Sequence, residues 1–387
     1  MTARTISILG ATGSIGTSTL DLVEREPDRF QVAALTAQRD VAGLAQAARR
    51  TRAQLAVIGD GALYGDLKAA LSGTRTQVAA GEQAVVDAAG LDADWTMAAI
   101  VGFAGLAPTM AALKAGGTIG LANKESLVAA GELVTAAAER HGARLLPVDS
   151  EHNAVFQCFD HAAPGSIRRV ILTASGGPFR EWSIDEMRAA TPAQAVKHPN
   201  WSMGAKISVD SATLMNKGLE LIEASHLFPL PADAFEALIH PQSVVHALVD
   251  YVDGSVLAQL GTPDMRTPIA HCLAWPDRMG TPCRQLDLAA VGRLDFMAPD
   301  LDRFPALGIA MDAMKAGGAR PAALNAVNEV AVAAFLAGRI GFLDIALIVH
   351  KALDRYDPPA PASLEDVFEI DAGARRAAHA AMEIMTA

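Results

Sequence analysis

Thr5-Ile-Ser-Ile-Leu9 runs directly into Gly10-Ala-Thr-Gly-Ser-Ile-Gly16, and these two stretches decide the fold. The first is a β-branched run typical of a buried strand. Leu20 and Val23 then recur at helical spacing in segment 17–25. Glycines at relative positions one, four and seven allow a tight turn, close approach of a pyrophosphate and a helix N-terminus facing an anion. The opening therefore predicts a dinucleotide-binding strand, turn and helix, although G-x-x-G-x-x-G differs from G-x-G-x-x-G.

Segment 30–37 is predicted as the next strand, and the residues after it bear on the choice of dinucleotide. A site for NAD has an acid at the end of this strand, where it holds the ribose 2′-hydroxyl. Here the strand ends in Thr36-Ala-Gln-Arg39, and no acid occurs before Asp40. Arg39 can face a 2′-phosphate instead, which favours NADPH. The alternative is a solvent-exposed loop arginine.

The alternation of strands and helices continues to about residue 141, which is typical of a parallel α/β sheet. Further strands are predicted at 53–58, 97–101 and 118–121, and helices at 41–50, 83–89 and about 122–141. Asn123 and Lys124 follow the last of these strands, where open α/β sheets bind ligands. A lysine there can polarise a carbonyl. The alternative is an exposed first-turn lysine, although a helix N-terminus disfavours a cation.

Two carboxylates, Asp149 and Glu151, follow the apolar run 145–148. If that run is a buried strand, its alternation puts both carboxylates on one side of its C-terminal end. Oxygen ligands suit Mg²⁺ or Mn²⁺, so the pair is a candidate metal site. The alternative is a solvated strand end or a helix N-cap formed by Asp149 or Ser150.

Two later segments carry features suited to a phosphate and a lid. Ser175 lies in a run of small residues after the predicted strand 168–173, where backbone N–H groups can form a phosphate nest. A plain turn would have the same composition. Segment 198–204 brackets Trp201 between proline and glycine, as expected of a mobile lid that excludes water. The alternative is a structural loop held by a buried tryptophan.

Segment 208–223 is the densest cluster of polar residues. If it is helical from residue 215, Asn216, Lys217 and Glu220 reach one patch at i, i+3 and i, i+4 spacing. That patch offers a third carboxylate to a metal and an ammonium to a phosphate, or it is a surface ion pair. Gly218 is unfavourable inside a helix. We interpret it as a sign of a site, together with the phosphate-compatible donors Ser211, Asn216 and Lys217.

The remaining third of the chain is predicted to be structural. Segments 244–251 and 255–260 flank Val252-Asp-Gly254, which predicts a hairpin at an antiparallel sheet edge. Segment 276–305 has little regular pattern and is predicted to be a connector. Four helices are then expected, at 306–315, 321–337, 342–356 and 364–385.

Composition limits the possible classes of protein. The 387 residues are long enough for two or three domains, and 51% hydrophobic content argues against disorder. A net charge of -11 without a basic block argues against nucleic acid as the partner, whereas a small anionic substrate is compatible. Three cysteines without a C-x-x-C pair argue for a reducing compartment. No membrane-spanning segment or signal peptide is recognised, so a cytoplasmic protein is expected.

Seven segments together resemble the 1-deoxy-D-xylulose 5-phosphate reductoisomerase family; they are 10–16, 122–126, 148–154, 174–179, 198–204, 209–224 and 261–271. The resemblance spans nearly the whole chain in order. It implies conversion of 1-deoxy-D-xylulose 5-phosphate to 2-C-methyl-D-erythritol 4-phosphate in isoprenoid biosynthesis. It also implies carbon–carbon cleavage and rejoining before reduction, with NADPH, a divalent ion (Mg²⁺, Mn²⁺ or Co²⁺) and a homodimer.

The resemblance also implies roles for individual residues. The expected metal ligands, catalytic together with Lys124, are Asp149, Glu151 and Glu220. The expected substrate contacts are Lys124, Ser150, Glu151, Ser175, His198, Ser211, Asn216, Lys217 and Glu220. The expected cofactor contacts are Thr12, Gly13, Ser14, Ile15, Gln38, Arg39, Asp40, Asn123, Glu125 and Gly204, and the expected flap residues are Trp201 and Met203.

One segment departs from the family pattern, which often reads Gly-Lys/Arg-Asn after the second strand. Here it reads Gln38-Arg39-Asp40. Arg39 still suits a 2′-phosphate, but Asp40 would repel one if it pointed inward. The selectivity for NADPH is therefore expected to be weaker than usual.

The predicted fold class is α/β, with an N-terminal Rossmann-like NADPH-binding domain (1–148), a central α/β catalytic domain (149–275), a connector (276–305) and a C-terminal helical bundle (306–387). Two rival functions fit parts of the sequence. A metal-independent semialdehyde or hydroxy-acid dehydrogenase would share the glycine turn. A non-catalytic NADPH-binding protein would bind the cofactor without consuming the sugar phosphate.

Overall fold

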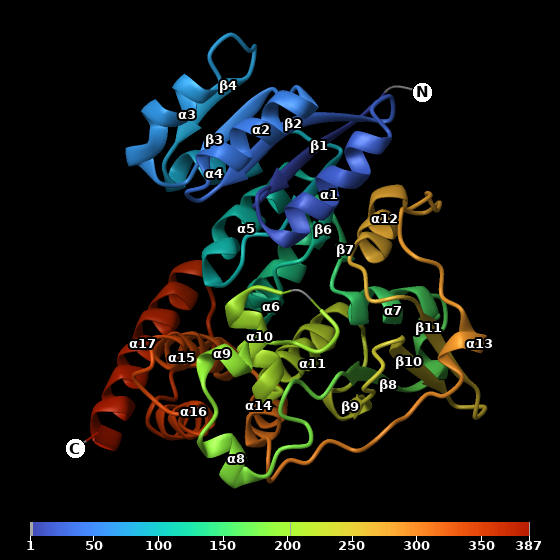
Figure 1. Cartoon of the computed structure of the whole chain (residues 1–387), viewed down its shortest axis with the longest axis vertical. Coiled ribbons are helices and arrows are strands. Elements are labelled where there is room, and N and C mark those ends of the chain that lie inside the picture. The colour runs from blue at the N-terminus through green and yellow to red at the C-terminus, as the bar shows by residue number, and fades with distance from the viewer. Residues whose placement is uncertain (1–2, 202, 387) are drawn as a thin grey trace. The chain divides into compact units, whose positions relative to one another are not determined.

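The computed structural model describes residues 3–201 and 203–386 and divides into two compact units (Figure 1). Unit 1 comprises the described residues up to Ser126, with Val134–Asn153 and Met265–Cys283. Unit 2 comprises Leu127–Leu133, Ala154–Asp264 and the described residues from Arg284 onward. These units are defined by packing. The domains predicted from the sequence, at 1–148, 149–275, 276–305 and 306–387, are defined instead by their expected functions. They stay a prediction.

Unit 1 is built on a parallel sheet, which has seven strands within the described residues in the order β4-β3-β2-β1-β5-β6-β7. The chain proceeds outward from β1 to β4 on one side and from β5 to β7 on the other, so the crossover direction changes between β1 and β5. Ligands bind at such a switch point, beyond the carboxyl ends of the strands. The strands are β1 (Arg4–Leu9), β2 (Phe30–Ala37), β3 (Leu55–Ile58), β4 (Gln77–Ala80), β5 (Trp95–Ala98), β6 (Thr118–Leu121) and β7 (Arg144–Pro147).

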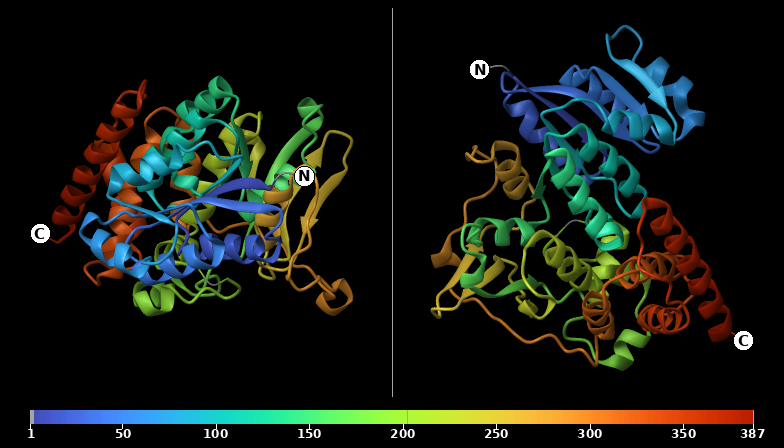
Figure 2. Two further views of the ribbon diagram at one scale, coloured as in Figure 1. Left: turned by 90° about the horizontal axis from the view of Figure 1, so that it is seen from above. Right: turned by 180° about the vertical axis from the view of Figure 1, so that it is seen from behind.

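Helices cover both faces of this sheet (Figure 2). The central strands are buried on both sides, and Ile6, Leu35 and Trp95 have no exposed surface. Near-continuous apolar strands are the expected consequence of parallel pairing. The helices are α1 (Ser14–Arg25), α2 (Val41–Thr51), η1 (Gly61–Leu63), α3 (Tyr64–Ala70), α4 (Glu82–Ala89), η2 (Phe103–Gly105), α5 (Leu106–Ala115) and α6 (Lys124–His141).

A segment from late in the chain completes unit 1. Helix α12 (Arg266–Ala274) is held by a hydrogen bond of 2.7 Å from the Arg4 guanidinium to the Leu273 carbonyl. The Cys272 thiol donates to the carbonyl of Pro147 at 3.2 Å. Strands β1 and β7, which are far apart in the sequence, are thereby both hydrogen-bonded to helix α12.

Unit 2 contains a mixed sheet of four strands, counted within the described residues, in the order β11-β10-β8-β9. Strands β10 (Val245–Tyr251) and β11 (Val256–Leu260) are antiparallel and β11 is at the edge, so the predicted hairpin is confirmed. Strand β8 (Ile167–Ala174) pairs with β10 antiparallel and with β9 (Phe235–Ile239) parallel. The helices near this sheet in sequence are α7 (Ser150–Cys158), η3 (Pro164–Ser166), α8 (Ile184–Arg188), α9 (Pro192–Ala195), α10 (Ala205–Thr213), α11 (Met215–Leu227), η4 (Ala232–Ala234) and α13 (Leu288–Val291).

The C-terminal part of unit 2 is helical, as predicted. Its helices within the described residues are α14 (Pro305–Ala316), α15 (Arg320–Leu336), α16 (Asp344–Arg355) and α17 (Leu364–Thr386). Helix α15 is buried along most of its length and packs against both α16 and α17. Both views of Figure 2 show α15, α16 and α17 side by side (orange to red). Segment 276–305 carries only the four-residue helix α13 among its regular elements.

Two sequence-based expectations about strands are wrong in detail. The strand predicted at 97–101 is β5, Trp95–Ala98, because Trp95 and Thr96 pair with β1 before the chain leaves the sheet. The strand before Asp149 ends at Pro147 and helix α7 begins at Ser150. Asp149 and Glu151 are therefore not alternate residues of a strand, and Glu151 lies in the first turn of a helix. The elements that were not predicted include β4, β9, α3, α5, α8, α9, α10, α12 and α13.

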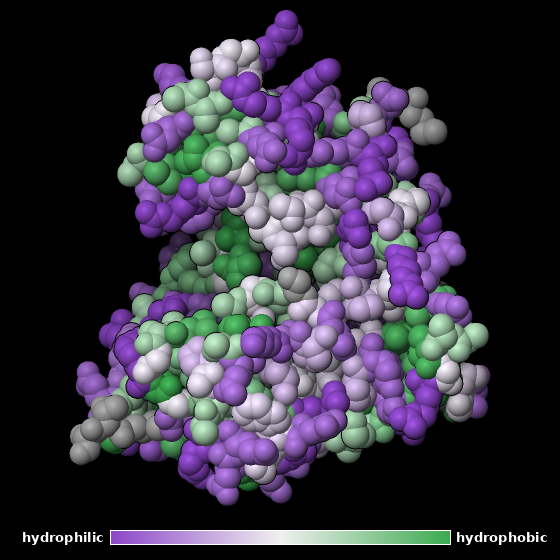
Figure 3. Space-filling view, viewed as in Figure 1, coloured by the Kyte–Doolittle hydropathy of each residue, from purple (hydrophilic) through white to green (hydrophobic). Residues whose placement is uncertain are grey.

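On the face seen in Figure 3, hydrophilic side chains cover much of the surface and hydrophobic ones are scattered among them. Among the described residues, no helix combines the length and apolar character that crossing a membrane requires.

Candidate active site

The glycine turn after β1 owes two of its glycines to packing. Gly10 has φ +86°, and a Cβ on it would lie 2.7 Å from the Ala99 carbonyl oxygen. A Cβ on Gly16 would lie 2.2 Å from the carbonyl oxygen of Gly10. Both distances are shorter than any side chain tolerates, so these positions require glycine whether or not a ligand is bound.

Helix α1 begins open. Its N-cap is Gly13, and within the described residues no side chain caps the helix and no acid lies in its first turn. Gly13 and Ser14 are exposed, while Thr12 and Ile15 are half-buried. The first N–H groups of a helix lack internal partners and carry a partial positive charge. This helix start is therefore suited to a phosphate or pyrophosphate.

The end of β2 presents an exposed cation, Arg39, and a capping acid, Asp40. Arg39 has a side chain that is 76% exposed, and its guanidinium lies 3.4 Å from the carboxylate of Asp60. The Asp40 carboxylate accepts the Gly43 N–H at 2.9 Å and so caps α2. Gln38 packs against the backbone of Gly59, where a Cβ would lie 2.2 Å from the Gln38 amide oxygen. The Asp40 carboxylate is thus engaged at its own helix start.

Helix α6, which follows β6 in the same sheet, begins closed. Asn123 is 1% exposed, and its side-chain oxygen accepts the Ser126 N–H at 3.0 Å. Its amide nitrogen donates to the carbonyls of Ile100 at 2.7 Å and Gly102 at 2.9 Å. It also lies 3.1 Å from the buried Glu125 carboxylate. The Asn123 side chain therefore ties the start of α6 to the loop after β5.

Lys124 and Asp149 form an ion pair across neighbouring strand ends. The Lys124 ammonium lies 2.5 Å from the Asp149 carboxylate, and the two side chains are 9% and 17% exposed. Lys124 follows β6 and Asp149 follows β7, and these strands are hydrogen-bonded neighbours. The carboxylate offsets the unfavourable placement of a cation at the start of α6. Beside it, the Ser150 hydroxyl donates to the Glu151 carboxylate at 2.5 Å.

His152 and Asn153, which follow on α7, are buried. His152 is fully buried, and no role is assigned to it. The Asn153 amide donates to the Pro147 carbonyl at 2.9 Å and lies 3.1 Å from Nδ1 of His271 on α12. Burial lowers the pKa of His271 to about 4. The contact between Asn153 and His271 was not predicted, because no local pattern signals a contact across more than a hundred residues.

In unit 2, Ser175 and His198 are brought together. Nε2 of His198 lies 2.9 Å from the Ser175 hydroxyl. Nδ1 of His198 accepts the N–H groups of Asn200 at 3.2 Å and Trp201 at 2.9 Å, so the ring proton is on Nε2. Burial lowers the pKa of His198 to about 4, which keeps the ring neutral. Ser175 therefore accepts from His198 and keeps its own proton for another acceptor.

The serine loop after β8 approaches helix α10 closely. Gly177 has φ +70°, and a Cβ on it would lie 2.6 Å from the Ser211 carbonyl oxygen. Helix α10 then ends at Leu214, which has a left-handed φ of +61°, and α11 begins at once. The structure thus brings the segments of Ser175 and Ser211 together, beside the start of α11.

Asn216, Lys217 and Glu220 form the predicted patch on α11. The Glu220 carboxylate accepts from the Asn216 amide at 2.5 Å and pairs with the Lys217 ammonium. Lys217 and Glu220 are 3% and 1% exposed, so this is not a surface ion pair. A buried pair of this kind is costly unless its remaining donors and acceptors are used.

Gly218 has a different explanation from the one the sequence suggested. A Cβ there would lie 2.3 Å from the Cβ of Ala310, where α11 packs against α14. The glycine allows two helices to approach closely, so its interpretation as a sign of a binding site is wrong.

The predicted flap follows His198. Trp201 is half-buried, with its ring centroid 6.1 Å from that of His246. Met203 is also half-buried, and Gly204 occupies the N-cap of α10. Ser202 lies outside the described residues. Burial is the main reason that the pKa of His246 is lowered to about 4, with a smaller effect from the Lys217 ammonium.

A parallel sheet with an open, glycine-lined helix start defines the class of the protein as a dinucleotide-dependent enzyme. Comparison with known proteins gives the family. The profile described as 1-deoxy-D-xylulose 5-phosphate reductoisomerase matches residues 6–131. Its C-terminal-domain profile matches 145–228, and the DXP reductoisomerase C-terminal domain matches 260–377.

The chain is 63% identical over 384 residues to 1-deoxy-D-xylulose 5-phosphate reductoisomerase of Zymomonas mobilis subsp. mobilis, covering 99% of both chains. Identity to the Rhodospirillum centenum enzyme is 58%, over 96% of this chain and 93% of that one. The solved Zymomonas mobilis enzyme in complex with NADPH superposes with a TM-score of 0.94, at 60% identity and 99% coverage of both chains. A DOX-P reductoisomerase in complex with NADPH, fosmidomycin and magnesium gives 0.95, at 45% identity and 99% coverage of both.

The chain belongs to the 1-deoxy-D-xylulose 5-phosphate reductoisomerase family. The family, the fold class and the enzyme class predicted from the sequence are therefore confirmed. The predicted cofactors agree with the NADPH and magnesium bound by these relatives. The roles of individual residues stay predictions.

Proposed function

We propose that the protein converts 1-deoxy-D-xylulose 5-phosphate to 2-C-methyl-D-erythritol 4-phosphate in isoprenoid biosynthesis, using NADPH and a divalent ion. The observation that carries this proposal is the agreement with the family over nearly the whole chain, in sequence and in fold. Mg²⁺ and Mn²⁺ are the expected ions, and Co²⁺ is a further candidate.

The cofactor is assigned to unit 1. Gly13, Ser14 and Ile15 offer backbone N–H groups at the open start of α1, which suits the pyrophosphate of a dinucleotide. The exposed guanidinium of Arg39 suits the 2′-phosphate of NADPH. Asp40 is occupied as the cap of α2, which reduces the repulsion expected from its sequence position. NADPH, when bound, supplies the hydride for reduction.

Three carboxylates are assigned to the metal: Asp149, Glu151 and Glu220. Such an oxygen donor set fits Mg²⁺ or Mn²⁺. The ion, when bound, acts as a Lewis acid toward the developing negative charge on substrate oxygens. The chain itself orients two of the ligands, because Lys124 pairs with Asp149 and Lys217 pairs with Glu220. Lys124 and Ser150 are assigned to the reacting end of the substrate.

The substrate phosphate is assigned to donors of unit 2, namely Ser175, Ser211, Asn216 and Lys217. His198 orients the Ser175 hydroxyl so that its proton is donated to the phosphate. A neutral imidazole is required for this role, and its burial provides it. Trp201 and Met203 are assigned to a flap that excludes water, and Asn123, Glu125 and Gly204 to NADPH binding.

We further propose a cytoplasmic homodimer. The described residues include three free cysteines, as expected in a reducing compartment. Val256 and Leu257 on the edge strand β11 are 50% and 49% exposed, and a second copy would cover such an apolar edge. Light scattering during size-exclusion chromatography tests the assembly. A monomer at micromolar concentration would contradict it.

The function is tested by following NADPH absorbance with 1-deoxy-D-xylulose 5-phosphate, with and without a divalent ion. We expect the enzyme to oxidise NADPH only when both the sugar phosphate and a divalent ion are present. A chelator should abolish the oxidation, and adding Mn²⁺ should restore it. Oxidation that persists in the chelator would indicate a metal-independent dehydrogenase. NADPH binding without oxidation would indicate a non-catalytic protein.

A further inference from the structure

A cavity of about 860 Å³ lies in unit 1 at the amino ends of strands β2, β3 and β4. Gln31 is the second residue of β2, Gln54 precedes β3 and Gln77 begins β4, and all three line the cavity. The glycine turn and Arg39 follow the opposite, carboxyl ends of β1 and β2. This cavity is therefore separate from the cofactor site, and its volume is within the range of small-molecule sites.

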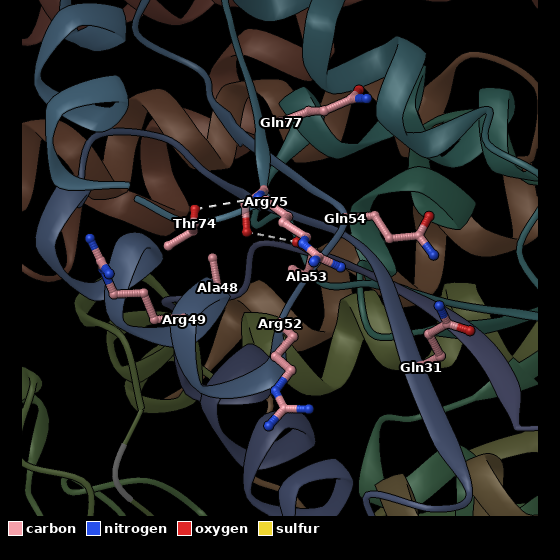
Figure 4. A pocket seen from close by; sticks show the side chains of 10 residues that line it. Gln31, Ala48, Arg49, Arg52, Ala53, Gln54, Thr74, Arg75 and Gln77 are labelled. Carbon is pink, nitrogen blue, oxygen red and sulfur yellow. Dashed lines mark hydrogen bonds between the residues drawn. The ribbon is translucent and has the colours of Figure 1, made fainter. Parts of the chain in front are cut away.

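The lining of this cavity is basic. Arg49, Arg52 and Arg75 line it, and none of its lining residues, all of which belong to the described chain, is acidic (Figure 4). Gln31 and Gln54 lie on the side opposite Arg49 in this view. The whole chain carries a net charge of -11. Three cations around one hollow in an acidic protein are an unusual local excess, and they attract an anion.

Arg49 is held in place by the chain. One of its terminal nitrogens donates to the carbonyls of Ala70 at 2.6 Å and Ser72 at 3.1 Å, just beyond α3. The floor of the cavity is also fixed, since the Thr76 hydroxyl donates to the Ala53 carbonyl at 2.8 Å. A preformed site loses less entropy on binding than a flexible one.

Arg52 occupies a backbone position that favours glycine. It follows α2 with φ 53° and ψ 41°, in the left-handed region. A non-glycine residue there costs about 1 kcal/mol. Within the described part of the chain, neither Arg52 nor Arg75 has a hydrogen-bonding or ionic partner for its guanidinium. Both residues are exposed, so their guanidinium groups are accessible to an anion in the cavity.

We propose that this cavity binds a small molecule carrying a phosphate or diphosphate group. Guanidinium groups present paired N–H donors whose spacing matches the oxygens of a phosphate. They therefore bind phosphate groups more strongly than neutral ligands. The three glutamines offer donors and acceptors to the uncharged part of such a ligand. A long polyanion fits less well, because the acidic charge of the chain as a whole repels it.

Isothermal titration of inorganic pyrophosphate into the full-length protein tests the proposal. Saturating NADPH occupies the cofactor site, EDTA removes divalent ions, and inorganic phosphate serves as a second probe. The test variant is Arg52→Gln with Arg75→Gln. The matched control is Arg25→Gln with Arg50→Gln, which removes two charges from unit 1 outside the cavity, where Arg25 pairs with Asp21 and Arg50 with Glu24.

We expect the wild type and the control to bind one more equivalent of pyrophosphate than the test variant, or to bind it at least tenfold more tightly. Any pyrophosphate bound at the substrate site is common to all three proteins. Arg52→Gly alone should weaken binding in the same way while raising the melting temperature, because glycine relieves the left-handed strain. Equal stoichiometry and affinity in the wild type and the test variant would overturn the proposal. Tighter binding of a short oligonucleotide than of pyrophosphate to the same arginines would overturn it as well.

Discussion

The two units hold their polar groups in different ways. Unit 1 presents backbone donors at the open start of α1, where no side chain of the described residues caps the helix. Unit 2 presents side chains that are bonded to one another, such as His198 with Ser175 and Lys217 with Glu220. The first arrangement follows from strand–turn–helix geometry. The second depends on particular pairs of side chains. A single substitution is therefore expected to have different effects on binding and stability in the two units.

The largest effect is expected from Glu220→Gln, which separates the two units functionally. We expect turnover to fall about 1000-fold, since losing a charged group at a metal and phosphate site costs about 4 kcal/mol. The NADPH dissociation constant should stay within a factor of about two, because unit 1 is untouched. Steady-state kinetics and fluorescence titration measure both. Glu236→Gln is the control, since Glu236 lies on β9 and is half-buried and paired with Arg169. A wild-type rate in Glu220→Gln would remove Glu220 from the site.

Gly13→Asp should convert the open start of α1 into a capped one. We expect NADPH to bind about a hundredfold more weakly, or about 2.7 kcal/mol, because a carboxylate then occupies the anion position. The free energy of unfolding should rise by about 1 kcal/mol, since an aspartate at the N-cap satisfies orphan N–H groups. Cofactor titration and urea unfolding test the two signs. Gly13→Ala adds neither charge nor cap, so an equal loss of affinity in it would contradict this account.

Gly218→Ala tests the packing role of Gly218 on the helix that carries Lys217 and Glu220. We expect the free energy of unfolding to fall by about 2 kcal/mol, because the new methyl group meets Ala310 at 2.3 Å. Adding Ala310→Gly should restore most of the loss, as a double-mutant cycle in urea would show. If the second substitution restored nothing, the close approach of α11 and α14 would not be the reason for the glycine.

The smallest effect concerns pH in unit 2. The pKa of His198 is lowered to about 4 in the folded state and is about 6.5 when unfolded, so between these values the unfolded chain binds more protons. Stability due to His198 is therefore present above pH 6.5 and is lost as the pH falls toward 4. We expect the stability difference between wild type and His198→Gln to shrink by about 1 kcal/mol from pH 7 to pH 4.5. A constant difference in urea unfolding would exclude this role.

Sequence reasoning succeeded where local pattern determines structure. The β-branched run and glycines of 5–16 predicted β1, the turn and α1 because each feature acts within a few residues. The i, i+3 and i, i+4 spacing likewise placed Asn216, Lys217 and Glu220 on one patch of α11. For these elements the physical cause is local, so the printed sequence contains it.

Other features depend on partners far along the chain. The reason for Gly218 is Ala310, and the side chain of Asn123 is used by the carbonyls of Ile100 and Gly102. The end of β7 at Pro147 was misjudged because an apolar run does not reveal where pairing with β6 stops. The family resemblance implied that Ser175 and His198 both contact the substrate, but the hydrogen bond between them was not predicted, because 23 residues separate them.

The return of α12 to unit 1 has a consequence for biosynthesis. The ribosome synthesises Ser126 long before Met265. However, Arg4 donates a hydrogen bond to the Leu273 carbonyl, and Cys272 donates one to the Pro147 carbonyl. Unit 1 thus cannot finish packing until every strand of the unit 2 sheet has left the exit tunnel. A C-terminal truncation anywhere before residue 265 would therefore remove α12 from the nucleotide-binding unit. To express unit 1 alone, the segment that contains α12 has to be fused to the N-terminal segments.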